Sequence, residues 1–470
     1  MAQYDLTPKL LAFLDPHLGF PLLSHLGSTG LYDPKDLAKA QFELAKRTAM
    51  VDYTLQFYKE AFPGEPEPSE IVQRREENMS RNSQLEKEAE RVLTVIEDPN
   101  LASTLKQDKA HNLAWLQQNY SLTLEQIEVL YRYGRFRFAC GNYSEASSYL
   151  YHYYVLAPDN KNTESLLWGK LACDTLTGNW ERALEDVRIL REHIDSQRAS
   201  ASAVAGVSSN EVTHEEILQK RVWLLHWSLY VFFNHASGRI KLIEMFLSPV
   251  YLNAIQMSCW WLLRYVVAAL IITRRHVSRG YVVETGNGST NKLSVQAAQR
   301  EVGKVIQMEA YRLQPDPLVD FFHQLYSELD FDRTQEELAK AEQVARQDFF
   351  LQEHVSEFVE NARFFVCEVY FRIHQHVDMA DLSKRLNMSK EEGAKWIAQF
   401  VSDTKADATV NAEEGVVHMN APSPLVYQSV IDKTRGITLR TSALAQAMER
   451  HMNPASDTQP HARKDEDDAQ

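Results

Sequence analysis

Cysteine is scarce in this chain of 470 residues, and none of its four cysteines forms a CxxC pair. They lie far apart within apolar, helix-like stretches, the usual setting of buried reduced thiols rather than of metal or redox chemistry. The pattern argues against a disulfide-stabilised secreted domain and favours a cytosolic protein. The four positions are Cys140, Cys173, Cys259 and Cys367.

Positive charge is also in deficit. Lys and Arg number 50 against 64 Asp and Glu, and the net charge is −14. A chain with this balance has no general attraction to nucleic acid or to an anionic membrane, although local basic patches remain compatible with it. We therefore expect protein partners rather than DNA.

The chain also lacks an apolar stretch long enough to cross a bilayer. The run most like one, residues 260–273, is shorter than the ~20 residues of a spanning helix and contains Arg264. The N-terminus has no signal-peptide pattern. The sequence predicts that 260–273 is a buried core helix, and that the protein is cytoplasmic with no membrane partner.

Familiar catalytic motifs are missing as well: the chain has no GxSxG, HExxH, P-loop or Rossmann fingerprint. The glycine-rich segment 286–290 lacks both the P-loop spacing and a preceding strand. His374 and His376 lie two residues apart on an expected helix, so they diverge by about 200° instead of converging on a metal. We predict no catalytic residue, no cofactor and no metal site, and a protein that is not an enzyme.

What the chain does contain is helical periodicity. Residues 1–62 are predicted as an N-terminal helical region. Its first part is divided into short helices by three prolines, and a single long helix then runs from Pro34 to about Ala61. The dividing prolines are Pro8, Pro16 and Pro21.

Residues 63–108 are predicted to be a linker followed by a polar helix over 71–96. One stripe of that helix is apolar, so it should lie on the surface or against a partner. Two later segments, 196–210 and 279–292, are small and polar or glycine-containing and are predicted to be flexible connections. The apolar stripe consists of Leu85, Ala89, Val92 and Ile96.

Residues 109–372 are predicted to form a helical-repeat solenoid. A Gly-Asn-aromatic triplet at 141–143 returns at 178–180, 37 residues later (178 − 141), and each copy is followed by Ala and then an aliphatic residue. This spacing is typical of the turn and second helix of a tetratricopeptide-like hairpin, and such hairpins stack on one another. A nearby tyrosine cluster either forms a recognition surface or packs between repeats, and its spread over several helix faces favours packing. The cluster is Tyr149, Tyr151, Tyr153 and Tyr154.

Residues 373–420 are predicted to form a winged helix. Asp378 can cap a first helix, and Ser389 with Glu392 forms the capping box of a second. Two short strands follow, 407–411 and 416–420, joined by a hairpin loop. The stretch holds five Lys and Arg against eight Asp and Glu, a net charge of −3, which disfavours a DNA-reading transcription regulator.

A helical segment over 421–452 and a disordered acidic tail over 453–470 complete the prediction. The apolar stripe of the helical segment and the free edge of the wing hairpin both need partners, so we predict protein contacts there. The predicted interface residues are Thr409, Val410, Val416, Val417, Val430, Ile437, Leu444 and Met448.

A solenoid that leads into a winged helix and terminal helices resembles the PCI proteins of the proteasome lid, the signalosome and translation initiation factor 3. Several stretches are similar to the family of the E subunit of eukaryotic translation initiation factor 3, and the likeness extends from residue 1 to about 450. These stretches are 13–23, 50–53, 139–151, 167–172, 223–235, 251–256, 358–365 and 372–397.

The resemblance implies a mainly α fold, with a PCI domain over about 220–420. It also implies a non-enzymatic scaffold that promotes pre-initiation complex formation and mRNA recruitment on the small ribosomal subunit. The implied partners are the other PCI and MPN subunits of the factor and the small ribosomal subunit, with mRNA reached indirectly. The alternative is a scaffold of a proteasome-lid or signalosome-like complex, which shares the fold.

Overall fold

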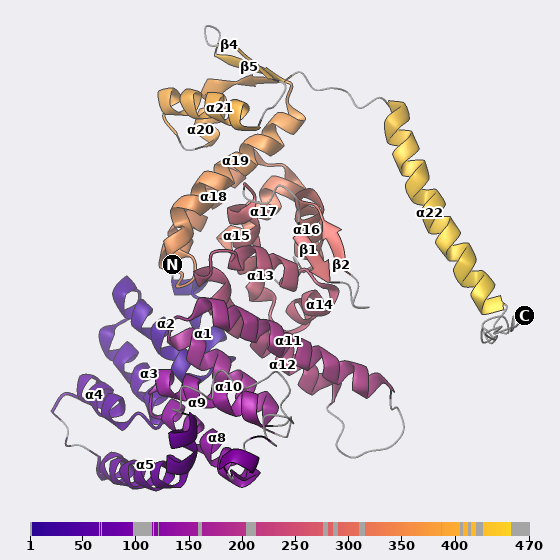
Figure 1. The fold of residues 1–470 in the computed structure, drawn as a ribbon. Coiled ribbons are helices and arrows are strands. Elements are labelled where there is room, and N and C mark those ends of the chain that lie inside the picture. The colour runs from indigo at the N-terminus through magenta and orange to yellow at the C-terminus, as the bar shows by residue number, and fades with distance from the viewer. Residues whose placement is uncertain are drawn as a thin grey trace, which may run out of the picture. The chain divides into compact units, whose positions relative to one another are not determined.

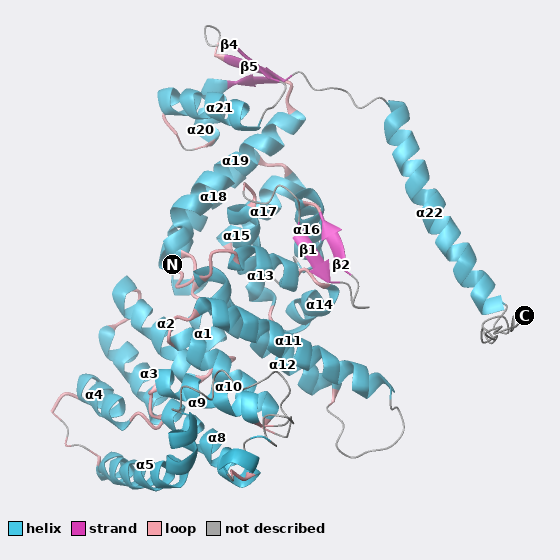
Figure 2. Cartoon of the chain, viewed as in Figure 1, coloured by secondary structure: helices cyan, strands magenta, loops and turns pink. Residues whose placement is uncertain are grey.

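A computed structural model describes residues 2–64, 66, 68–96, 115, 117–120, 122–157, 162–203, 213–275, 281–284, 290–309, 315–386, 388–404, 408–411, 415–419 and 426–452. The chain divides into two compact units (Figure 1). The first holds residues 1–370 with 385–387, and the second holds 371–384 with 388–470. Helices dominate both units and strands are few (Figure 2), which confirms the predicted mainly α class.

The N-terminal region differs from its prediction in two places. After η1 (Ala2–Tyr4) and α1 (Thr7–Leu11), helix α2 (Pro16–Thr29) continues through Pro21, so the expected break there is wrong. Four leucines of α2 are buried, and this packing outweighs the backbone hydrogen bond that a proline removes.

The single long helix predicted up to Ala61 is two helices, α3 (Pro34–Lys46) and α4 (Val51–Ala61). Thr48 stabilises the break between them, because its hydroxyl donates to the Ala45 carbonyl and accepts from the Met50 amide. From another helix, Arg74 donates to the carbonyls of Lys46 and Thr48 at 3.0 and 2.9 Å. These contacts satisfy carbonyls that a helix end leaves unpaired.

Helix α5 (Ser69–Ile96) carries the predicted polar helix, and its apolar stripe packs within this chain. Leu85, Ala89 and Val92 are all buried, the first two against residues of α8 (Leu124–Ala139). We predicted that this stripe lies on the surface or against a partner protein. That prediction is wrong, because the stripe packs against helices of its own chain. Residues 65 and 67 of the predicted linker, and residues 97–108 after the helix, lie outside the described residues.

The two Gly-Asn-aromatic triplets form the turns between paired helices, as predicted. The first joins α8 to α9 (Tyr143–Leu156), and the second joins α10 (Thr163–Leu176) to α11 (Trp180–Ala203). Gly141 and Gly178 have φ values of +90° and +77°, a conformation that favours glycine. The following Asn amide donates five residues back in both copies, to Arg137 and Asp174. The repeated sequence thus builds the same turn twice.

Packing is the main role of the tyrosine cluster in α9. Tyr153 is buried beside Tyr131, and Tyr149 stacks on Tyr133, whereas Tyr151 is 50% exposed. Helix α11 continues to Ala203, so the predicted flexible connection is helical over its first part. Residues 204–210 of that connection lie outside the described part of the chain.

The centre of the first unit is formed by five consecutive helical segments rich in buried apolar residues. These are α12 (His214–Asn234), α13 (Gly238–Phe246), α14 (Pro249–Ser258), η2 (Trp260–Leu262) and α15 (Leu263–Thr273). Every residue of α15 is buried, which confirms the predicted core helix. Among the described residues, no single helix has the length and apolarity to cross a membrane; α14 with 260–273 meets that test only as a pair bent by 118°.

The remainder of the first unit contains a hairpin that the sequence analysis missed. Strands β1 (Tyr281–Glu284) and β2 (Thr290–Leu293) pair antiparallel inside the segment predicted as a flexible loop. Tyr281 is buried and its hydroxyl lies 2.9 Å from that of Thr273, which anchors the hairpin to α15. The helices that follow are α16 (Val295–Glu309), α17 (Pro317–His323), η3 (Gln324–Glu328), α18 (Phe331–Gln347), η4 (Gln352–His354) and α19 (Val355–Ile373).

The first 26 residues lie against helices that come some 200 residues later. Trp227 donates to the Phe13 carbonyl at 3.1 Å, and the Tyr230 hydroxyl donates to the Leu18 carbonyl. Arg264 donates to the Tyr4 carbonyl at 2.7 Å. The N-terminal region is therefore part of the core of the first unit.

Arg264 is the centre of a buried ionic cluster. Its side chain is 2% exposed and pairs with Asp316 at 2.6 Å and with Asp348 at 3.2 Å. The Tyr265 hydroxyl also donates to Asp348. The single charge in the apolar run 260–273 thus links three distant parts of the chain.

The second unit contains the winged helix. Strand β3 (His376–Asp378) precedes α20 (Met379–Arg385) and α21 (Lys390–Thr404), and β4 (Ala408–Asn411) and β5 (Val416–Met419) follow. Both predicted caps are present: Asp378 accepts from the Ala380 amide, and Ser389 bonds with Glu392. The sheet has three strands in the order β3-β5-β4, not the two predicted.

Helix α22 (Val426–Met452) is the last described element, as predicted for 421–452. Every side chain described on it is exposed. The predicted disordered tail, 453–470, lies outside the described residues.

Candidate functional site

The wing places the four predicted strand residues in two different positions. Val416 and Val417 belong to β5, which pairs with β3 on one side and β4 on the other, so the prediction of a free edge at these residues is wrong. Val417 is fully buried. Thr409 and Val410 belong to β4, an outer strand of the sheet. The missed strand β3 is the reason for the difference, because it covers the edge that a two-stranded hairpin would expose.

Strand β3 also changes the histidine geometry. Helix α19 ends at Ile373, so the helical spacing assumed for His374 and His376 is wrong. His376 instead faces His418 across the β3–β5 pair, with ring centroids 4.7 Å apart. Across the described part of the chain, no group of three His, Cys, Asp or Glu residues is arranged to hold a metal ion.

Helix α22 presents the predicted stripe to solvent. Val430, Ile437, Leu444 and Met448 are between 55% and 63% exposed. Three further apolar residues that the sequence analysis did not select, Tyr427, Ile431 and Leu439, are exposed as well. Tyr427 and Ile431 are four residues apart and share one side of the helix next to the predicted stripe, and this spacing could have identified them.

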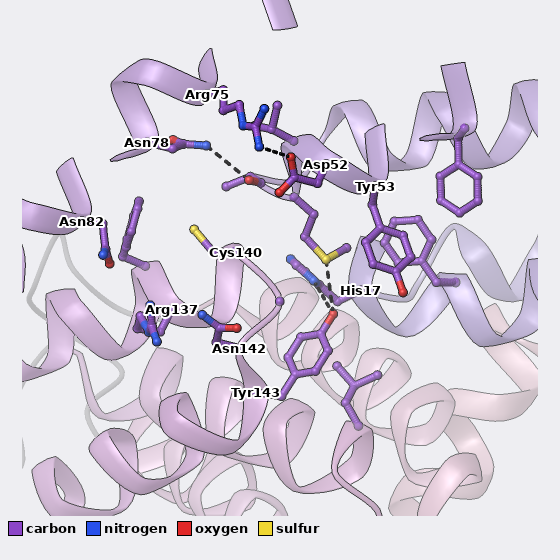
Figure 3. Close-up of a pocket in the computed structure, with 18 of the residues that line it drawn as sticks. His17, Asp52, Tyr53, Arg75, Asn78, Asn82, Arg137, Cys140, Asn142 and Tyr143 are labelled. Carbon is purple, nitrogen blue, oxygen red and sulfur yellow. Dashed lines mark hydrogen bonds and ion pairs between the residues drawn. The ribbon is translucent and has the colours of Figure 1, made fainter. Parts of the chain in front are cut away.

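A groove in the first unit was not predicted at all. Its walls come from α2, from the start of α4, from α5 and from the α8–α9 turn, and its volume is about 980 Å³ (Figure 3). His17 Nδ1 lies 3.0 Å from the Tyr143 hydroxyl, which donates to the Met50 sulfur at 3.7 Å. The lining positions span 17 to 176, so a search for motifs of short spacing does not bring them together.

One wall of the groove is aromatic and the opposite wall is polar. Phe57 stacks on Phe20 with ring centroids 6.1 Å apart, and Tyr53 follows at 5.9 Å from Phe57. Helix α5 supplies Arg75, Asn78, Met79 and Asn82, whose spacings of three and four residues place them on one face.

Cys140 lies in the groove, where Figure 3 shows its thiol between Asn82 and His17. It is half-buried, whereas the other three cysteines are buried. Burial raises the pKa of the Cys140 thiol above its usual value, against the opposing effect of Arg137 and Arg81. Burial also lowers the pKa of His17. The groove thus holds a neutral thiol and a neutral imidazole, and its chemistry favours binding over nucleophilic attack.

Comparisons with known proteins identify the family. The model of the eIF3 subunit 6 N-terminal domain matches residues 5–137, and that of the PCI domain matches residues 324–421. The E subunit of eukaryotic translation initiation factor 3 from Mycosarcoma maydis is 52% identical over 473 residues, covering 97% of this chain and 87% of the relative. The chain belongs to the E-subunit family of eukaryotic translation initiation factor 3.

Other members of the E-subunit family have lower sequence identity to this chain and also align with most of its length. The Aspergillus clavatus protein is 40% identical and covers 94% of this chain, and the Aspergillus fumigatus protein is 39% identical and covers 95%. The comparisons confirm the resemblance stated from the sequence stretches. Most of the groove lies within the N-terminal family domain, the wing lies within the PCI domain, and α22 follows both.

Proposed function

We propose that this chain is a scaffold component of eukaryotic translation initiation factor 3 that acts in pre-initiation complex formation and mRNA recruitment. The proposal is supported by E-subunit relatives that match over nearly the whole chain, and by the family domain at its N-terminus. In this role the chain works in the cytoplasm and contributes binding surfaces rather than a catalytic step. Its partners are the sister PCI and MPN subunits and the small ribosomal subunit, and mRNA is reached through them.

Two surfaces of the second unit serve assembly in this proposal. Helix α22 carries the supporting observation: a 27-residue helix with an exposed apolar stripe, which gains stability by burying that stripe against another chain. The outer strand β4 is the second surface, because unpaired backbone groups on an edge strand can accept a strand from a partner.

The domain organisation predicted from the sequence forms part of this proposal. Residues 1–62 and the helix over 71–96 support the solenoid of 109–372, and that solenoid carries the winged helix of 373–420. The terminal segment, 421–452, then provides the helix for a bundle with sister subunits.

The test is purification of the tagged full-length chain from its own cells, with identification of the co-purifying subunits. We expect the PCI and MPN subunits of translation initiation factor 3 together with small-subunit ribosomal proteins. Recovery of proteasome-lid or signalosome subunits in their place would contradict the proposal and favour the alternative scaffold role.

A further inference from the structure

The rim of the groove in the first unit carries two exposed apolar side chains. Tyr53 on α4 is 55% exposed and Met79 on α5 is 67% exposed, and both line the groove. An exposed aromatic residue and an exposed Met beside a concave surface are typical of a protein-binding site. The volume of about 980 Å³ is at the upper end of ordinary ligand pockets, large enough for several side chains.

The groove offers one arginine to an anionic ligand. Its lining contains Arg75 and Arg137 against Asp52, and Arg137 already pairs with Glu145, which leaves Arg75 as the cation that a ligand can reach. Arg75 pairs with Asp52 at 3.2 Å, but the two side chains are 56% and 78% exposed. A pair this exposed contributes little stability, so a carboxylate from a ligand can compete for Arg75.

The wall formed by α5 and α8 also has unmatched hydrogen-bonding atoms. Asn82 Oδ1 and Arg137 Nε are both shielded from solvent and have no hydrogen-bond partner among the residues that the structure describes. One atom is an acceptor and the other a donor, and an unmatched buried polar atom destabilises the folded chain until a partner satisfies it. A peptide bond offers both complementary groups, an N–H and a C=O, to side chains that rotate toward it.

We propose that this groove binds an acidic peptide segment of a partner protein that inserts apolar side chains between Tyr53 and Met79. The carboxylates of the segment pair with Arg75, and its backbone is drawn toward the wall that carries Asn82 and Arg137. The proposal concerns a surface separate from the wing and α22, and it does not depend on which assembly the chain joins.

Single-stranded RNA is the competing ligand, because it also uses aromatic faces and arginines. The lining favours a peptide for two reasons. Two cations opposed by Asp52 are too few to follow a phosphate backbone, whose binding scales with the number of phosphates neutralised. RNA phosphates are also acceptors only, so RNA would have to turn a 2′-hydroxyl or a base toward Asn82 Oδ1, whereas every non-proline peptide bond carries a donor beside its acceptor.

Cys140 provides a readout of occupancy that does not depend on activity. It lines the groove and is half-buried, while Cys173, Cys259 and Cys367 are buried. An alkylating reagent should therefore modify Cys140 first, and a bound peptide should slow that modification. Because burial raises the pKa of Cys140, the reaction is best followed at mildly alkaline pH.

The experiment is selection of a random peptide library on phage against the full-length chain, followed by titration of the enriched peptides as fluorescent conjugates. We expect enriched peptides to combine Asp or Glu with aromatic or aliphatic residues and to protect Cys140 from alkylation. Met79→Glu and Arg75→Glu should each weaken them about tenfold or more. Met257→Glu, at a 72% exposed methionine on α14, is the matched control and should bind as the unaltered chain does.

Several outcomes would overturn the proposal. They are failure to enrich any peptide, enrichment of basic peptides, binding unaffected by Met79→Glu, or no protection of Cys140. Tighter binding of fluorescent oligouridine, with affinity falling steeply as salt rises, would assign the groove to RNA instead. Thermal melting of each variant shows whether a loss of binding reflects a loss of folding. None of these outcomes changes which subunits co-purify through α22. A failure of the peptide-binding proposal can therefore be distinguished from a failure of the proposed assembly role.

Discussion

Helices α15 and α22 both contain many apolar residues, yet every residue of α15 is buried and every described side chain of α22 is exposed. Helix α15 is apolar on all sides and is covered by its own chain, with Arg264 as its only charge. Helix α22 confines much of its apolar surface to one stripe and keeps Arg and Lys on the remainder. The way in which apolar residues are distributed around a helix, more than their number, distinguishes a core helix from a helix that serves assembly.

The strongest test of this contrast is Arg264→Met, which keeps the volume of the side chain but removes its charge. Two carboxylates, Asp316 and Asp348, would then be left without their buried cation. We expect a loss of about 3–5 kcal/mol in the free energy of unfolding. The measurement is denaturant unfolding of the full chain.

The matched control is Arg435→Met on α22, where the side chain is exposed and little change is expected. Equal effects of the two substitutions would show that the Arg264 cluster contributes no more than a surface charge.

The second test is Ile437→Asp with Leu444→Asp on α22. If the stripe is buried only in the assembly, recovery of partner subunits should fall by about a hundredfold or more while thermal melting of the isolated chain stays the same. Ser442→Asp with Gln446→Asp lies on the opposite face of the helix, at exposed positions, and is the control for helix propensity. Wild-type recovery of partners would remove α22 from the assembly, and unfolding of the isolated double variant would place it in this chain's own core.

The third test, with the smallest expected effect, compares a buried and an exposed charged residue of α11. Asp186 is buried beside Lys170, and burial raises the pKa of its carboxyl to about 7, against the opposing effect of Lys170. The folded state therefore binds this proton more tightly than the unfolded state. Its stabilising contribution is present at low pH and is lost as pH rises from the ordinary pKa of 3.8 to about 7.

Asp186→Asn should remove this contribution and reduce the fall in unfolding free energy across that range by about 1–2 kcal/mol. Arg188→Ala, on the same helix but 56% exposed, should leave the pH dependence unchanged. Denaturant unfolding at a series of pH values gives the measurement. An unchanged slope in Asp186→Asn would show that another group titrates.

Local patterns predicted much of the fold because they act through neighbouring residues. The glycines at 141 and 178 require a left-handed turn, and Asp378 and Ser389 cap the helices that begin beside them. Such signals need no knowledge of the rest of the chain. The buried run 260–273 was predictable for a similar reason, since its composition allows few other environments.

The missed elements depend on distant partners. Strand β3 has only three residues and becomes a strand because β5, some 40 positions later, pairs with it. The β1–β2 hairpin is anchored by Tyr281 against α15, a contact that its glycine-rich sequence does not indicate. Pro21 stays helical because α2 is buried. The groove likewise needs four separate segments, so the first unit must be folded before its lining residues meet.

The contacts of the N-terminal segment also determine when, during synthesis of the chain, that segment can complete its folding. Tyr4 leaves the ribosome 260 residues before Arg264, its hydrogen-bond partner. At ~5–20 residues per second, that interval is roughly 13–50 s. For most of that interval Leu18 has been synthesised but Tyr230, whose hydroxyl donates to the Leu18 carbonyl, has not. The beginning of the chain is therefore completed late in folding, and chaperones or neighbouring nascent subunits have that long to reach it.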